Sequence, residues 1–479
     1  MSISAVEGNR HPWAMVALCM SVLMIAVDAS IVNVALPSIG KSLGFHKESL
    51  VWIVNAYLSA YGGFWLIGGR LGDVFGYRRV FSVGVLVFTG ASLACGLAVS
   101  PELLVTGRFV QGMAGSVVST MATTLVMRLH NESAARIKAL GVCSFVASGS
   151  ASAALLLGGI VTESIGWRWI FLINVPIGAF AYSLSTIRIQ LDMERPAHRA
   201  LDVAGAITVT GALVIGSYAV VKQDLTSQAF WERPALLVIA LSLFLIFVLI
   251  ESVTKEPLVP LRIFRSTNLA VAMFGGILLT AAMSGWTYFS SLYLQVVLKY
   301  SPLQVGVVFL PATVVMAIVA LVIGPTLVSR VGIVRLLVIG MLCVATALVL
   351  FARQPVAGAL LMDVIPGMLL IGAGIGMAEN ALMLGALSGV PDTEFGVASG
   401  VVNAALTMGG TLGLAILADV AASRTDRYLS NGIGMSDALN YGFQVAYLTA
   451  ALFAVVAALI CGIFLRVPMG EAHSFRSSV

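Results

Sequence analysis

The sequence has little charge. Only 10% of its 479 residues are Asp, Glu, Lys or Arg, whereas 59% are hydrophobic and the mean hydropathy is +1.00. A soluble globule of this length would need much more polar surface to cover it. The composition therefore excludes a soluble protein and predicts an integral membrane protein.

Histidine and cysteine are also scarce. The five histidines lie at loops or termini without the spacing of metal ligands, and the five cysteines fall singly inside apolar runs. We therefore expect no metal site, no cofactor and no disulfide framework. The chain lacks Gly-x-Ser-x-Gly, His-Glu-x-x-His and paired catalytic acids, which argues against an enzyme, and it shows no re-entrant filter loop of the kind that channels carry.

Long apolar runs are what the sequence has in abundance. Each is long enough to span a lipid bilayer, and short polar segments separate one from the next. We predict an all-α integral membrane protein with 14 transmembrane helices. The predicted spans are 13–34, 49–69, 80–99, 102–127, 138–161, 167–187, 203–221, 234–251, 268–297, 304–328, 333–352, 362–387, 396–419 and 442–465.

Lysine and arginine are distributed unevenly among the loops. If the N-terminus is cytoplasmic, the loops on that side carry 17 of these residues and the loops outside carry 9. Cytoplasmic loops of membrane proteins are enriched in positive charge, so we expect a multi-pass protein of the cell membrane with both termini cytoplasmic. This bias explains the net charge of +5 and the pI near 9.0, and we expect no nucleic acid as partner.

Asp28 is an acid inside the first apolar run. An ionised side chain at the bilayer centre costs at least about 2.5–3.5 kcal/mol, so such a residue usually faces a partner or a cavity. Asp28 lies about 22 Å above the cytoplasmic end of its run, and Arg108 about 9–10 Å below the outer end of its own, in a core about 30 Å thick. The two depths nearly coincide, and we predict a buried Asp28–Arg108 pair.

Glu379 is a second acid within an apolar run, at a lower depth than Asp28. It shares a helical stripe with glycines and with Met383, an adaptable side chain that suits a loose binding wall, although methionine is more often plain core. We assign Asp28, Arg108 and Glu379 to proton coupling. Asp28 would mainly carry the proton while Glu379 attracts the cargo, or the roles are exchanged.

Other polar side chains recur at helical spacing inside the runs. Trp52 and Asn55 share one face of the second helix with Ser59, a pattern that indicates either a wet cavity or interhelical hydrogen bonds in a packed bundle. Tyr288, Ser291 and Gln295 also share one face, which could line a cavity or carry aromatics that anchor the helix at the membrane interface. The candidate residues of a substrate cavity are Trp52, Asn55, Gln111, Tyr288, Gln295, Met383 and Asn403.

The polar segment after the second run reads GRLGDVFGYRR. It resembles the signature loop between helices two and three of the major facilitator superfamily, although Val74 stands where that family usually has a basic residue. We assign a conformational gating role to Gly69, Asp73, Gly76, Arg78 and Arg79, with topology-setting charge as the alternative. Residues 327–335 repeat this spacing imperfectly, which indicates that the chain consists of two related halves.

Further segments are similar to one branch of that superfamily, the fourteen-helix drug/proton antiporters. They include 28–37, 166–178, 288–311 and 396–411. The Arg108-x-x-Gln-Gly pattern resembles the fourth-helix motif of the superfamily, in which the arginine is associated with proton transfer. The fifth run departs from the resemblance, because exporters of this type usually carry a Gly-Pro step where this chain reads ALLLGG.

The resemblance implies alternating access between two six-helix bundles. We expect an N-terminal bundle over 1–187, linker segments and two extra helices over 188–265, and a C-terminal bundle over 266–479. The implied function is proton-coupled efflux of lipophilic, cationic drugs by a monomer in the lipid bilayer, with antibiotic resistance as its consequence. Export of an endogenous metabolite or lipid, or a facilitator without strict proton antiport, stays open because of the missing Gly-Pro step.

Overall fold

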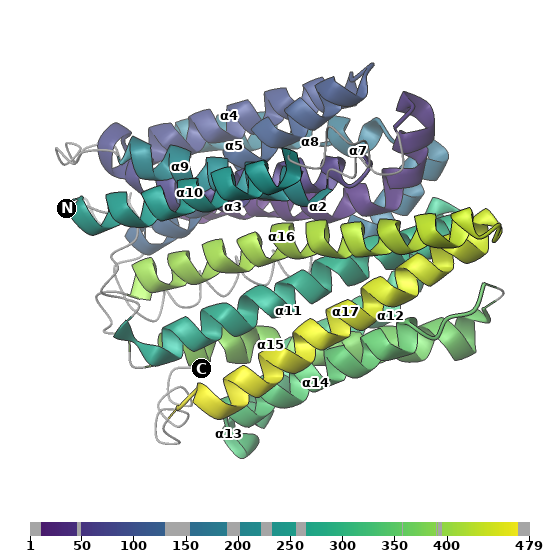
Figure 1. Cartoon of the computed structure of the whole chain (residues 1–479). Coiled ribbons are helices and arrows are strands. Elements are labelled where there is room, and N and C mark those ends of the chain that lie inside the picture. The colour runs from purple at the N-terminus through teal and green to yellow at the C-terminus, as the bar shows by residue number, and fades with distance from the viewer. Residues whose placement is uncertain are drawn as a thin grey trace, which may run out of the picture. The chain divides into compact units, whose positions relative to one another are not determined.

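The structure is a computed structural model of the chain. It describes residues 11–45, 49–129, 154–188, 202–221, 232–254, 265–356, 358–388, 390 and 395–467. These ranges contain helices and no strand, and ten of the helices are long and apolar enough to cross a membrane (Figure 1). The prediction of an all-α membrane protein is confirmed for this part of the chain. Residues 138–153 of the predicted span 138–161 lie outside the described residues.

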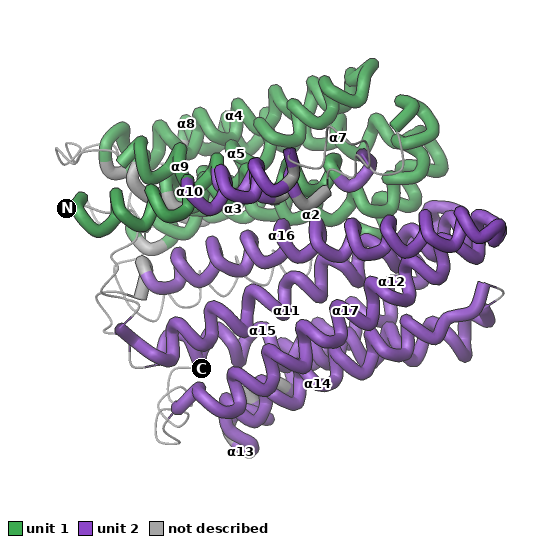
Figure 2. The backbone as a smooth tube through the Cα atoms, in the orientation of Figure 1, with its two compact units in different colours: residues 1–45, 52–211, 243–258 green, residues 46–51, 212–242, 259–479 purple. Residues whose placement is uncertain are grey.

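Two compact units divide the chain (Figure 2). Unit 1 takes its described residues from 1–45, 52–211 and 243–258, and unit 2 from 46–51, 212–242 and 259–479. The helices α9 (Val203–Val221) and α10 (Glu232–Val253) contribute to both units. The predicted middle segment 188–265 is therefore shared between the two units.

Among its described residues, unit 1 has four long helices and three shorter ones that lie wholly within it. In chain order they are α2 (His11–Leu43), α3 (Trp52–Phe75), α4 (Tyr77–Gly96), α5 (Pro101–Leu129), a helix over Ala154–Ser164, α7 (Trp169–Leu172) and α8 (Asn174–Arg188). The α3 helix packs along α5, and α8 packs against both α2 and α4.

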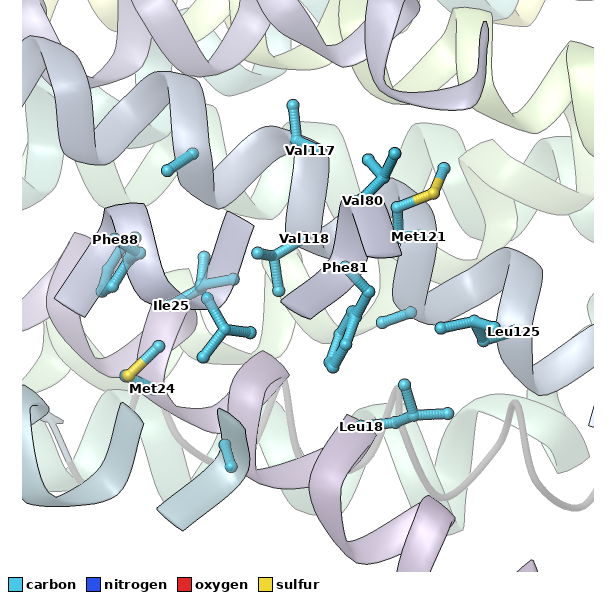
Figure 3. Packing of buried hydrophobic residues seen from close by; sticks show 14 of the residues in the cluster. Leu18, Met24, Ile25, Val80, Phe81, Phe88, Val117, Val118, Met121 and Leu125 are labelled. Atoms are coloured by element: carbon cyan, nitrogen blue, oxygen red, sulfur yellow. The ribbon is translucent and has the colours of Figure 1, made fainter. Parts of the chain in front are cut away.

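The core of unit 1 lies where α2, α4 and α5 meet. Met24, Phe81 and Val118 come from these three helices, and each is almost fully buried (Figure 3). Gly112 sets the distance between α5 and α3, because a Cβ atom there would collide with the backbone carbonyl of Tyr57. Small residues allow helix backbones to approach closely in membranes, and this approach brings α3 against the middle of α5.

Among its described residues, unit 2 contains seven α-helices that lie wholly within it, the short α13 among them, and three π-helical turns. They are α11 (Thr267–Leu292), η2 (Tyr293–Val297), α12 (Pro302–Ile318), η3 (Val319–Ile323), α13 (Gly324–Val331), α14 (Ile333–Phe351), η4 (Leu360–Val364), α15 (Ile365–Leu387), α16 (Phe395–Ser430) and α17 (Met435–Phe464). Gly340 of α14 and Gly374 of α15 face one another, since a Cβ atom on either would lie 2.7 Å from the carbonyl oxygen of the other.

Several helix ends differ from the predicted spans. The α3 helix continues to Phe75 and α16 to Ser430, whereas spans ending at 69 and 419 were expected. Both extensions are rich in polar residues. Hydropathy therefore places the end of each span too early, although the backbone stays helical beyond it. The segment 69–79 is therefore mostly helical, and Gly76 is the single residue between α3 and α4.

Gly76 and Gly332 occupy equivalent places in the two units. Each is the single residue between two helices, with φ of 91° at Gly76 and 88° at Gly332. This conformation is open to glycine and strained for other residues. The imperfect repeat of 69–79 at 327–335 in the sequence therefore corresponds to a repeated turn in the backbone.

Candidate functional site

Asp28 and Arg108 form a salt bridge inside unit 1. Asp28 lies within α2 and Arg108 within the first third of α5, and both side chains have no exposed surface. The Arg108 Nη1 atom donates a hydrogen bond to Asp28 Oδ2. The pairing expected from the two depths is present.

Two amides donate to the other carboxylate oxygen. Asn174 Nδ2 lies 2.9 Å from Asp28 Oδ1, and Gln111 Nε2 lies 3.1 Å from the same atom. Asn174 begins α8 and Gln111 stands one turn after Arg108 on α5. Asp28 is thus held by three donors from two neighbouring helices, which satisfies a carboxylate that no water can reach.

Ser92 of α4 ties the two amides together. Its Oγ atom accepts from Gln111 Nε2 at 2.7 Å and from Asn174 Nδ2 at 3.5 Å. The Gln111 Oε1 atom in turn accepts from Arg108 Nη1 at 3.0 Å. The result is a closed polar network of α2, α4, α5 and α8, which we call the Asp28 network: Asp28, Ser92, Arg108, Gln111 and Asn174.

The α3 helix supports the arginine from another side. Arg108 Nε donates to the carbonyl oxygen of Ile53 at 3.1 Å, and the guanidinium carbon lies 4.2 Å from the centre of the Tyr57 ring. A cation over an aromatic face is stabilised electrostatically, more so when it is shielded from water. Arg108 Nη2 has no hydrogen-bond partner among the described residues. The guanidinium is therefore fixed in place, and Nη2 is its one nitrogen that lacks an acceptor among the described residues.

The stability of this arrangement depends on both charges being present. A fully buried carboxylate and guanidinium are stable together because their charges cancel, and loss of either charge leaves the other uncompensated in a medium of low dielectric constant. Intramembrane ionisable residues of this kind mark ion and substrate pathways. The Asp28 network is accordingly the strongest functional-site candidate of unit 1.

Gln111 lies in the Asp28 network and is fully buried, whereas the sequence suggested a substrate-cavity position for it. Ser92 and Asn174 belong to the network and were not predicted. A signal for Asn174 existed, because it lies in the segment 166–178 that resembles the sixth-helix entry of the antiporters. Ser92 carries no such signal, since single serines are frequent in transmembrane helices.

The polar face of α3 is buried to different degrees. Asn55 and Ser59 have no exposed surface, and neither the Asn55 amide nor the Ser59 hydroxyl has a hydrogen-bond partner among the described residues. Trp52 is partly exposed. Leaving a buried polar group unpaired costs about 1–3 kcal/mol, so a second arrangement that supplies partners would stabilise Asn55.

The predicted residues of α15 and α16 are more accessible. Glu379 lies near the middle of α15 and is exposed, whereas Met383, one turn later, is partly exposed. Glu379 forms no ion pair with another described residue. Asn403 of α16 is partly exposed and donates to its own helix at Ser399 O, 2.9 Å away.

Tyr288 and Gln295 do not share one environment. Tyr288 is buried and lines a cavity of about 200 Å³ in unit 2, together with Asp419 of α16. Gln295 lies in the π-helical turn η2, where its Nε2 atom donates to Ser291 Oγ at 3.1 Å. Ser291 and Gln295 therefore still meet on one side of the helix, although the backbone there is π-helical.

The five gating residues lie at the junction of α3 and α4. Arg78 donates to the carbonyl oxygen of Thr186 near the end of α8, and Arg79 is exposed in the first turn of α4. Gly76 makes the turn itself. The surroundings of the side chains at positions 69 and 73 fall outside what the structure describes.

The fold and the Asp28 network define a membrane transporter with many apolar helices. A sequence profile of the Major Facilitator Superfamily matches residues 18–414. The chain belongs to this superfamily, as its motifs suggested.

Named relatives and solved structures agree with this family. The puromycin resistance protein pur8 of Streptomyces alboniger is 34% identical over 466 residues, covering 95% of this chain and 90% of that protein. The tetracenomycin C resistance and export protein of Streptomyces glaucescens is 32% identical over 419 residues, covering 86% and 77%. A crystal structure of a D-xylose-proton symporter superposes with a TM-score of 0.67 at 13% identity, over 97% of this chain and 99% of that one. The superposition shows a shared fold.

Proposed function

We propose that this chain exports lipophilic, cationic drugs in exchange for protons, by alternating access. In this proposal 14 helices cross the cell membrane, six in each bundle and two extra, both termini are cytoplasmic, and the protein works as a monomer. The names of the puromycin and tetracenomycin C relatives support drug-like cargo and outward transport. The buried Asp28–Arg108 pair is the observation that carries the coupling.

Asp28 is the proposed proton carrier. A proton on either oxygen makes the carboxyl group neutral and removes its attraction to Arg108. A buried charge that loses its partner costs about 3–5 kcal/mol, so the arrangement described above would lose stability. Another arrangement that hydrates or re-pairs Arg108 then gains population, which is the differential stabilisation that a two-state transporter requires.

Glu379 is the proposed attractant for the cargo. A carboxylate near the middle of a transmembrane helix is too costly to expose to lipid, so an exposed Glu379 implies a water-accessible surface. A negative charge without an ion-pair partner favours a cationic ligand, and Met383 offers an adaptable apolar contact one turn away. Asn55 and Asn403 are proposed as further polar contacts of the cargo.

Transport by the full-length protein in sealed vesicles tests this function. An imposed pH gradient should drive ethidium uptake into inverted vesicles by the wild type, and Asp28→Asn should abolish the gradient-driven component while downhill exchange of ethidium persists. Glu379→Gln should weaken ethidium transport with the proton response retained. If both variants transport ethidium like the wild type under the same gradient, the proposed coupling is wrong.

The helix over Ala154–Ser164 favours one alternative, because its described residues include no proline where antiporters usually carry a Gly-Pro step. Without that step the helix keeps its regular hydrogen bonds. A facilitator without strict proton antiport does not depend on that signature, and export of an endogenous metabolite or lipid is the other alternative. Wild-type flux that is downhill only and independent of pH would support the facilitator.

A further inference from the structure

A long apolar groove runs along unit 1, apart from the Asp28 network. It has a volume of about 550 Å³ and is lined by α3, α4, α5 and the first turns of α9. Its walls are almost entirely apolar, with Phe64, Val83 and Met113 among them. Val83 is 53% exposed and Ile207 66% exposed, so the groove is open at the surface of unit 1.

The groove has the length of one leaflet. On α4 its lining residues extend from Arg79 to Val87, about 12 Å at 1.5 Å per residue, and on α3 from Phe64 to Phe75, about 16 Å. Half of a hydrocarbon core about 30 Å thick is about 15 Å. A single acyl chain entering from the nearer membrane surface would therefore fit along it.

Charged groups occur at one end of the groove only. Arg79 stands in the first turn of α4, and Asp202 immediately precedes α9. The α9 helix runs antiparallel to α3, because Gly63 packs on Thr210 while Phe75 and Val203 line the same groove further along. Arg79 and Asp202 consequently lie at the end where α3 finishes and α4 begins.

The two oxygens of Asp202 differ in their surroundings. Oδ1 accepts from the backbone N–H of Gly205 at 2.8 Å and caps α9. Oδ2 is buried and has no hydrogen-bond partner among the described residues. Glu251 adds negative charge nearby, since a Cβ atom at Gly205 would lie 2.7 Å from Asp202 Oδ2 and 3.0 Å from Glu251 Oε1. This corner can accept a hydrogen bond from a cationic donor.

We infer that the groove binds one acyl chain of a phospholipid whose head group carries a phosphate and a primary ammonium, as in phosphatidylethanolamine. The phosphate lies at Arg79, where guanidinium and phosphate charges attract. The ammonium donates to Asp202 Oδ2. A trimethylammonium head group has no N–H to donate, and a glycerol head group has no positive charge, so both are bound less well.

The primary experiment compares three lipids on the full-length wild-type protein. The protein is reconstituted with equal amounts of phosphatidylethanolamine, phosphatidylcholine and phosphatidylglycerol, extracted in mild detergent, and its retained lipids are identified by native mass spectrometry. Because a charge-assisted hydrogen bond distinguishes the head groups, we expect about tenfold preference for phosphatidylethanolamine. Equal retention of the three lipids overturns the inference.

Matched variants locate the site. Val83→Trp fills the groove from an exposed position and should release the retained lipid, whereas Leu86→Trp, on the same helix and 54% exposed, lies outside the groove and should retain it. Asp202→Asn keeps a good helix cap and should lose the preference for phosphatidylethanolamine over phosphatidylcholine. The inference is overturned if the two tryptophan variants retain the lipid equally. It is also overturned if tetraphenylphosphonium displaces the lipid one for one, because the groove would then bind cargo.

Discussion

Asn174 Nδ2 donates to Asp28 Oδ1 over 2.9 Å and thereby joins the start of α8 to the middle of α2. The two residues are 146 positions apart in the chain. This bond completes the set of donors around the carboxylate, because Arg108 and Gln111 both come from α5. The strongest functional candidate of unit 1 therefore depends on the packing of α8 as well as on the ion pair.

Asn174→Ala should destabilise the protein and slow transport. Hydrogen bonds to charged groups contribute about 1.5–3 kcal/mol, and the variant leaves Asp28 Oδ1 with one donor fewer. We expect a lower midpoint of thermal unfolding in detergent and a reduced rate of gradient-driven ethidium transport. Ser183→Ala on the exposed face of α8 is the matched control. Equal midpoints for the two variants would show that the amide contributes nothing to the network.

Arg108→Met should be more harmful than the double variant Asp28→Asn with Arg108→Met. The single change leaves a buried carboxylate without its main partner, at a cost of about 3–5 kcal/mol, whereas the double change removes both charges. Unfolding midpoints of the wild type, both single variants and the double variant give the coupling free energy. Additive effects of the two single changes would contradict a direct ion pair.

Gly76→Ala should strain the turn between α3 and α4. At φ of 91° an alanine costs about 1–3 kcal/mol, because its Cβ atom crowds the backbone. Gly90→Ala, inside the adjoining helix α4, is the control, since a Cβ atom there meets nothing within 4 Å, and it should be neutral or slightly stabilising. Thermal unfolding compares the two. A smaller loss in Gly76→Ala than in Gly90→Ala would be incompatible with the turn described.

Glu379→Gln should change cargo preference according to charge. The variant keeps the size of the side chain and removes its attraction for cations, so ethidium efflux should fall several-fold while efflux of an uncharged lipophilic substrate changes little. Efflux from cells that lack other pumps measures both. Asn380→Ser, at the neighbouring exposed position of α15, is the control. A parallel fall for both substrates would assign Glu379 a structural role instead.

Local sequence patterns predicted the fold class and the central pair. Apolar runs of sufficient length form helices in lipid because each backbone group must be paired within its own segment. The depths of Asp28 and Arg108 in the membrane were enough to predict that they form a pair. The rise per residue of a helix is constant, and a single buried charge is costly. The repeated spacing at 69–79 and 327–335 was also visible in the sequence, and the structure places a glycine with positive φ in each of these segments.

Tertiary packing alone decided the remaining features. Ser92 and Asn174 became partners of Asp28 because α4 and α8 approach α2 there, and their residue types do not distinguish them from ordinary polar contacts between helices. The helical continuation to Phe75 and the π-turn at Gln295 escaped prediction because hydropathy does not report backbone hydrogen bonding. The groove beside Asp202 forms only where α9 packs beside α3, α4 and α5, so no local pattern could reveal it.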